Sequence, residues 1–250
     1  MKTLERQRAL VTGGSRGLGL GIVEALVARG AEVTVLARSA GPLEEAKRRL
    51  GVSIIAGDAA DPALAASVLR ELSPTVLVLN AGATPTMAPL HQQSWESFSE
   101  IWNNDVKAAF HWVRTALNLP LAPGSRVLLS SSGAAIGGSP LSGGYAGAKR
   151  MIWLMADYAS GASRELGLGI RFQALLPRQI NGGTELGRSA AEAYARRKGV
   201  STEAFLAGLG KPFSLREYGE FVVDVLTKPE YEAPTAFTLH GEQGIQPLGV

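Results

Sequence analysis

The chain has 250 residues, 46% of them hydrophobic, and is long enough to bury a large core, so we expect residues 1–250 to form a single domain. Lys and Arg number 25 against 22 Asp and Glu, and the net charge of +3 is too small to suggest a nucleic-acid partner. The absence of cysteine excludes disulfide scaffolds, thiolate metal sites and thiol catalysis. The sequence contains no run of about 18 apolar residues, so it predicts no membrane span. We expect a cytoplasmic protein.

Apolar runs alternate with helical stretches along the chain, a pattern typical of βαβ units and a parallel sheet. The first run ends at Thr12 and leads into a glycine-rich turn, after which a helix is expected to begin near Gly17. Glycines at 13, 17 and 19 would let a phosphate approach the backbone, where the unpaired first-turn amides of the helix would face it. An ordinary glycine-containing turn is the alternative while this stretch is considered alone.

The glycine turn can hold the pyrophosphate of a dinucleotide. If it does, the end of the second expected strand, Val33 to Ala37, bears on the choice between NAD and NADP. A carboxylate at this position favours the free ribose hydroxyl of NAD, whereas an arginine accommodates the 2′-phosphate of NADP. Here Arg38 follows Ala37 and no acid is present, and Arg16 in the glycine turn can lie on the same side. Two guanidiniums holding one phosphate favour NADP(H), and two exposed arginines without a ligand are the alternative.

The remaining apolar runs predict a seven-stranded sheet. They are Val52 to Ile55, Thr75 to Leu79, Val127 to Leu129, Ile170 to Leu176 and Ala236 to Leu239. A long helix is expected over about Ser94 to Leu119, and another over Leu215 to Leu226.

Three side chains near the fifth strand have a spacing with a chemical use. Ser132 stands at the strand end, Tyr145 follows thirteen residues later, and Lys149 lies four residues beyond it. On a helix, positions four apart share a face, so a lysine ammonium would lie beside the phenol and favour its ionised form. The serine hydroxyl can then hold a substrate oxygen while Tyr145 gives or takes its proton.

These motifs together resemble the short-chain dehydrogenase/reductase family. The resemblance rests on Thr12 with the glycine turn, on Asn80-Ala81-Gly82, and on Ser132, Tyr145 and Lys149, and it extends to about Pro177. It implies a Rossmann-type, doubly wound α/β fold with a seven-stranded parallel sheet, helices on both faces and a small helical substrate lid. It also implies hydride transfer between NADP(H) and a carbonyl or secondary alcohol, without a metal.

The resemblance assigns roles residue by residue. Ser132, Tyr145, Lys149 and Asp105 are the catalytic candidates. The cofactor-binding candidates are Gly13, Ser15, Arg16, Gly17, Leu18, Gly19, Arg38, Asp58, Ala59, Asn80, Ala81, Gly82, Tyr145, Lys149, Pro177 and Ile180. For the nicotinamide carboxamide, Pro177 and the backbone at Ile180 are the best candidates, and Thr184 is a weaker one.

Two positions depart from the family pattern. Asp105 stands where the family has an asparagine that holds a water beside the catalytic lysine, and Arg178 stands where a glycine usually follows Pro177. If Asp105 is ionised, it favours the Lys149 ammonium and weakens the effect of Lys149 on Tyr145; if it is protonated, it can mimic the amide. Asn104 lies about 100° around the helix and cannot replace Asp105 without a local bulge.

Three further expectations concern partners and alternatives. The family places its lid at about residues 184–212, where two amphipathic helices are predicted, although a helical pair without gating is the alternative. The resemblance also suggests a homodimer or homotetramer, formed through the helices that contain Ser94 and Tyr145. The competing function is an NADP(H)-binding sensor or scaffold with impaired catalysis, and the substrate cannot be identified beyond a small carbonyl compound or alcohol.

Overall fold

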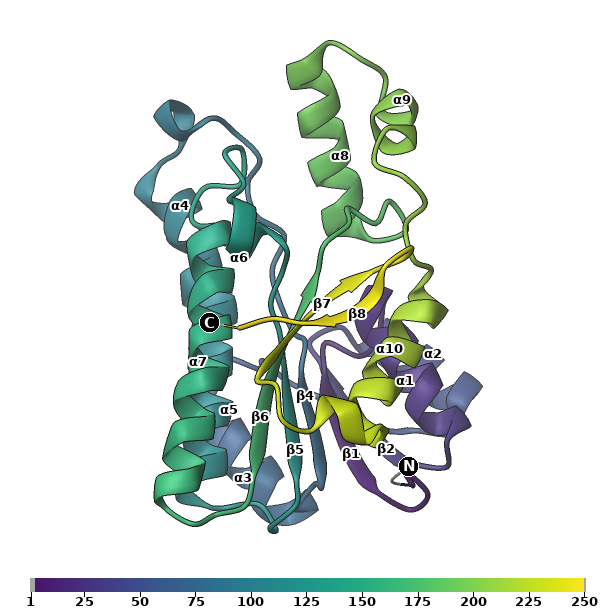
Figure 1. Ribbon diagram of the computed structural model, residues 1–250, viewed down its shortest axis with the longest axis vertical. Helices are drawn as coiled ribbons and strands as arrows, with labels where there is room; N and C mark the ends of the chain where they lie inside the picture. The colour runs from purple at the N-terminus through teal and green to yellow at the C-terminus, as the bar shows by residue number, and fades with distance from the viewer. Residues whose placement is uncertain (1–2, 250) are drawn as a thin grey trace.

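The computed structural model describes residues 3–249, which build an eight-stranded sheet of order β3-β2-β1-β4-β5-β6-β7-β8 (Figure 1). The strands are β1 (Arg8–Thr12), β2 (Glu32–Ala37), β3 (Ser53–Ala56), β4 (Val76–Leu79), β5 (Arg126–Ser130), β6 (Arg171–Pro177), β7 (Ala236–His240) and β8 (Gly244–Pro247). Strands β1 to β7 are parallel, and the strand order reverses between β1 and β4. Ligands bind open α/β sheets outside the carboxyl ends of the strands at such a reversal.

Helices cover both faces of the sheet, which confirms the doubly wound α/β fold (Figure 1). One layer holds α1 (Gly17–Ala28), α2 (Ala40–Leu50) and α10 (Leu215–Thr227), and the other holds α3 (Pro62–Leu72), α5 (Lys107–Asn118) and α7 (Tyr145–Glu165). The remaining elements include α4 (Trp95–Ile101), α6 (Ala134–Gly137), α8 (Glu185–Lys198), α9 (Thr202–Ala207) and the 3₁₀ turns Leu90–Gln92 and Pro229–Tyr231. Among residues 3–249, no helix is both long and apolar enough to cross a membrane.

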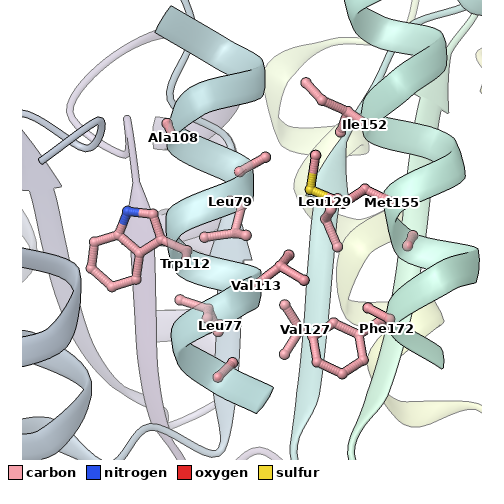
Figure 2. Packing of buried hydrophobic residues seen from close by; sticks show 14 of the residues in the cluster. Leu77, Leu79, Ala108, Trp112, Val113, Val127, Leu129, Ile152, Met155 and Phe172 are labelled. Atoms are coloured by element: carbon pink, nitrogen blue, oxygen red, sulfur yellow. The ribbon is translucent and has the colours of Figure 1, made fainter. Parts of the chain in front are cut away.

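Strand alternation divides the core between the two layers. On β4, Leu77 and Leu79 face α5 and α7, where they pack in one buried cluster with Trp112 and Met155 (Figure 2). Val78, between them, belongs to the cluster beneath α1 and α10. Successive side chains of a strand point to opposite faces, so a strand that is buried on both faces reads as a continuous apolar run.

The predicted count of seven strands is wrong, because the chain adds an eighth. After β7 the backbone reverses, Gly244 adopts a φ of 67°, and β8 pairs with β7 in the antiparallel direction. The sequence of β8, Gly-Ile-Gln-Pro, is only partly buried and has no apolar run by which to predict it. Its pairing covers the edge that β7 would otherwise expose.

The predicted helix over 94–119 contains a change of winding. Ser94 caps α4, and a π-helical turn over Trp102–Val106 precedes α5. A π turn inserts an extra residue per turn and is frequent at functional sites. This turn contains Asp105, so the register of this side chain is not that of an uninterrupted α-helix.

Helices α1 and α10 approach each other more closely than any side chain would allow. A Cβ atom at Gly21 would lie 2.1 Å from the Leu215 carbonyl oxygen, and one at Gly219 would lie 2.1 Å from the Gly21 carbonyl oxygen. This contact fixes α1 against α10 close to the glycine turn, because Gly21 lies in the first turns of α1.

We predict that Gly219→Ala lowers the free energy of unfolding by about 1–3 kcal/mol, because the added methyl group forces the two backbones apart. Thermal and denaturant unfolding measure this change. Gly161→Ala in α7 is the matched control, since its Cβ atom would meet no atom within 4 Å and alanine favours the helix. Equal stability of the two variants would contradict the prediction.

Candidate active site

A cavity of about 830 Å³ opens at the carboxyl edge of the sheet and is lined by the loops after β1 to β6 and by α8 and α9. It brings together all the residues that the sequence analysis assigned to catalysis or to the cofactor. They come from segments as distant as Gly13 and Ile180, and Thr184 lines the cavity as well. Parallel strands that end at one edge produce this convergence.

The glycine turn forms the floor of one end of the cavity. Gly13 and Gly17 have φ values of 66° and 54°, in the left-handed region that favours glycine. A Cβ atom at Gly19 would lie 2.1 Å from the Gly13 carbonyl oxygen, so only glycine allows this approach. Helix α1 begins at Gly17 without a side-chain cap, which leaves its first amides available to an anion.

Hydrogen bonds join the turns after β1 and β4. The Thr12 hydroxyl accepts hydrogen bonds from the backbone amides of Asn80 (3.0 Å) and Ala81 (3.1 Å). The Asn80 side-chain amide donates to the Gly13 carbonyl oxygen (3.3 Å) and its oxygen accepts from the Ser130 hydroxyl (3.3 Å). Asn80 therefore holds the glycine turn against the ends of β4 and β5.

The cavity is also lined by Arg38 and Asp58, both of them predicted to contact the adenosine portion. Arg38 is exposed at the end of β2, and the Asp58 carboxylate accepts a hydrogen bond from the Ala60 amide (2.9 Å). Asp61 caps α3 by accepting from the Ala63 amide (2.8 Å), the structural role predicted for it. Arg16 is not free, because it forms an exposed ion pair of 2.7 Å with Glu185 of α8.

The catalytic candidates converge from β5 and α7. Tyr145 is the first residue of α7, and the Lys149 ammonium, one turn later, lies 5.6 Å from the centre of its ring. Lys149 Nζ donates to the Ser130 carbonyl oxygen (3.3 Å), and the Ser131 hydroxyl donates to the Lys149 carbonyl oxygen (2.7 Å). Ser132 lines the same cavity, where its hydroxyl accepts from the Ala134 amide (3.2 Å).

Asp105 forms a buried ion pair with Lys149. Its Oδ2 lies 2.9 Å from Lys149 Nζ, and its Oδ1 accepts a hydrogen bond from the Ala83 amide (2.8 Å). The two side chains are 1% and 8% exposed. Burial alone would lower the pKa of Lys149, but the nearby Asp105 and Tyr145 together raise it above its usual value. Lys149 is therefore held as an ammonium.

The π turn decides which side chain meets Lys149. A bulge could have brought Asn104 into this position, yet its amide donates instead to the Glu100 carbonyl oxygen (2.8 Å). Asp105 faces the cavity, and the absence of a side chain at Gly82 makes room, since a Cβ atom there would lie 2.8 Å from Asp105 Oδ2.

Comparison with known proteins identifies the family. A sequence model of short chain dehydrogenases matches residues 7–195. The chain belongs to the short chain dehydrogenase family. Hydroxynaphthalene reductase arp2 from Aspergillus fumigatus is 36% identical over 154 residues, 58% of this chain and 56% of the reductase.

Two further proteins illustrate how far the likeness extends. A cis-2,3-dihydrobiphenyl-2,3-diol dehydrogenase from Rhodococcus globerulus is 31% identical over 202 residues, 76% of this chain and 70% of the dehydrogenase. The crystal structure of an NAD+-bound xylitol dehydrogenase has a TM-score of 0.81, covers 95% of this chain and 98% of its own, and is 20% identical. The chain spans less than two thirds of the hydroxynaphthalene reductase, and the likeness to the xylitol dehydrogenase shows the fold alone.

Two positions of this short chain dehydrogenase differ from what its motifs imply. The Thr184 hydroxyl caps α8, accepting from the Gly187 amide (3.0 Å) and donating to the Asn181 carbonyl oxygen (2.9 Å), so its proton is already engaged. Arg178 is exposed at the cavity beside Gly133, where a Cβ atom would lie 2.9 Å from the Arg178 Cα.

The sequence analysis missed contacts that close the cavity from above. Glu185 binds Arg16, and the Tyr194 hydroxyl of α8 lies 2.8 Å from the Ser139 hydroxyl of the loop before α7. It also missed Tyr218 of α10, which lines the cavity from the layer opposite α7. No local sequence signal marks these residues, because their partners lie far away in the chain.

We predict that Asp105→Asn retains or raises turnover and shifts the pH profile of alcohol oxidation to lower pH. The asparagine oxygen can still accept a hydrogen bond from Lys149, while the carboxylate that helps to raise the pKa of Lys149 is removed. Steady-state rates measured against pH test this.

Asp61→Asn is the control, because asparagine caps a helix as well as aspartate does and Asp61 lies outside the cavity. A large loss of turnover in Asp105→Asn would show that the carboxylate has a role of its own. An inactive parent that gains activity on this change would favour a binding protein.

Proposed function

We propose that this chain is an NADP(H)-dependent oxidoreductase that transfers a hydride between the nicotinamide and a small carbonyl compound or secondary alcohol. The observation that supports it most strongly is the convergence of Ser132, Tyr145 and Lys149 with the glycine turn in one cavity. The reductases and dehydrogenases among its relatives point to the same class of reaction.

The residues at the glycine turn fit a dinucleotide. The close approach of Gly13 to Gly19 and the uncapped start of α1 leave backbone amides open to a pyrophosphate. Arg38 and Asp58 suit the adenosine portion, and Pro177 and Ile180 line the nicotinamide end.

Each catalytic side chain has one task in the proposed reaction. When bound, the nicotinamide supplies or accepts the hydride. The Ser132 hydroxyl donates a hydrogen bond to the substrate oxygen and orients it. Tyr145 donates its phenolic proton to that oxygen during reduction and removes a proton during oxidation, while the Lys149 ammonium stabilises the phenolate that remains. The buried Asp105 fixes the position and charge of Lys149.

The preference for NADP(H) over NAD(H) rests on the adenosine end. Arg38 is exposed at the end of β2, where a carboxylate would favour NAD. Arg16 lines the same cavity, and its ion pair with Glu185 is exposed, so a phosphate can compete for it at small cost.

The substrate and the assembly are proposed from the surroundings of the cavity. Its roof includes the apolar side chains of Leu186, Phe205 and Leu209, which suit a molecule with an apolar portion, and we propose that residues 184–212 act as its lid. Exposed aromatic residues on the helices of one face, among them Trp95 of α4 and Phe110 of α5, support a homodimer or homotetramer.

A cofactor-binding sensor or scaffold is the second candidate. The buried pair of Asp105 and Lys149 favours it, because a carboxylate that compensates the lysine charge weakens the effect of that charge on Tyr145. Measurement of turnover with NADPH and a panel of ketones and diketones separates the two candidates.

We expect Arg38→Asp to weaken NADPH binding by about 1.5–3 kcal/mol, the size of a lost charged hydrogen bond, while NADH binding changes little. Isothermal titration calorimetry with both cofactors measures the difference. Arg70→Asp, an exposed change on α3 away from the cavity, is the control. The preference is refuted if the parent binds NADH and NADPH equally well.

Tyr145→Phe should reduce turnover by about 10²–10⁴, the contribution of a general acid, and leave NADPH binding nearly unchanged because the ring still packs. Tyr158→Phe on the same helix is the control, since its side chain is 60% exposed. Undiminished turnover in Tyr145→Phe would remove Tyr145 as the proton donor.

A further inference from the structure

Tyr218 of α10 is a buried phenol that the proposed reaction does not use. Its side chain is 0% exposed, yet it lines the cavity, and its hydroxyl has no hydrogen-bond partner among residues 3–249. A buried hydroxyl without a partner costs about 1–3 kcal/mol, so such groups usually have a partner outside the chain or serve a function.

The protein neighbours of Tyr218 do not satisfy it. Burial raises the pKa of Tyr218 well above its usual value, the adjacent Ser130 side chain lowers it in part, and the nearby Tyr145 adds to the rise. Ser130 Oγ directs its own proton to the Asn80 side-chain oxygen (3.3 Å). At neutral pH, Tyr218 therefore keeps its proton and is a hydrogen-bond donor at the floor of the cavity.

Tyr218 and Tyr145 reach the strand ends from opposite layers. On β5, Leu128 packs beneath α1 and α10, whereas Val127 and Leu129 pack beneath α5 and α7. Tyr218 belongs to the α1 and α10 layer and stacks on Phe213, with ring centres 5.5 Å apart. A flat ring bound across the strand ends would thus meet Tyr145 from one layer and Tyr218 from the other.

Most other polar side chains at this end of the cavity already have partners. Besides Thr184, which caps α8, the engaged groups include the Asn181 amide, which donates to the Phe213 carbonyl oxygen (2.7 Å), and the Asn181 oxygen, which accepts from the Gly183 amide (2.9 Å). The nicotinamide carboxamide needs a donor for its oxygen, and the protonated phenol of Tyr218 remains available.

We propose that Tyr218 is a cofactor-positioning residue whose hydroxyl donates a hydrogen bond to the nicotinamide carboxamide. This inference rests on the proposed NADP(H) function. The bond holds the ring from the α10 side, while Ser132 and Tyr145 act on the substrate.

The test compares two ligands that differ only in the nicotinamide. Calorimetric titrations of the parent, Tyr218→Phe and the exposed control Tyr158→Phe use NADPH and 2′-phospho-ADP-ribose, which lacks the ring. Tyr218→Phe is expected to raise the Kd for NADPH by about three- to tenfold, as for one neutral hydrogen bond. It should leave the Kd for 2′-phospho-ADP-ribose unchanged.

Thermal unfolding gives a second readout. Without ligand, Tyr218→Phe should have a Tm equal to or above that of the parent, because an unpaired buried hydroxyl is removed, while the rise in Tm on adding NADPH should be smaller. Tyr218→Met also lacks the hydroxyl, and it replaces the phenylalanine variant if that variant does not unfold cooperatively.

Three outcomes overturn the proposal. Unchanged NADPH binding in Tyr218→Phe excludes the bond, and an equal loss for both ligands assigns Tyr218 to the fold instead. If the parent binds neither ligand, the NADP(H) function fails and the inference fails with it, whereas the first two outcomes leave that function intact.

Discussion

The arrangement of the site depends on the buried ion pair between Lys149 and Asp105. Removing two charges from water is costly, and the pair is tolerated because each partner makes a further hydrogen bond, Lys149 to the Ser130 carbonyl oxygen and Asp105 to the Ala83 amide. These bonds join α7, the π turn, the loop after β4 and the end of β5. Displacing any of these segments would leave a buried charge without its partner.

Around this fixed centre, the roof of the cavity is held by weaker contacts. The pair of Arg16 and Glu185 is exposed, and exposed ion pairs contribute about 0–1 kcal/mol. The hydroxyls of Tyr194 and Ser139 make one more contact across the opening. The floor, by contrast, consists of glycine backbone and strand ends. A rigid floor beneath a weakly held roof suits a cavity that must admit both a cofactor and a substrate.

Glycines accompany both departures from the family pattern. Gly82 leaves space for the Asp105 carboxylate, and Gly133 leaves space for the backbone at Arg178. At each position a Cβ atom would come within 3 Å of the unusual residue. Each glycine therefore permits a close approach that a larger residue would block.

The sequence alone predicted the elements that arise from short-range patterns: the parallel strands, the helix that begins at Gly17, the Asp61 cap and the spacing of Tyr145 and Lys149. Their determinants lie within a few residues of one another, and strand ends of a parallel sheet must converge. Tertiary structure alone decided that a π turn contains Asp105 and that this carboxylate pairs directly with Lys149, that Thr184 is used in a cap, and that Tyr218 reaches the cavity from α10. These outcomes depend on which distant segments pack together. Arg16 and Glu185 are 169 positions apart, and no local pattern encodes a contact over that distance.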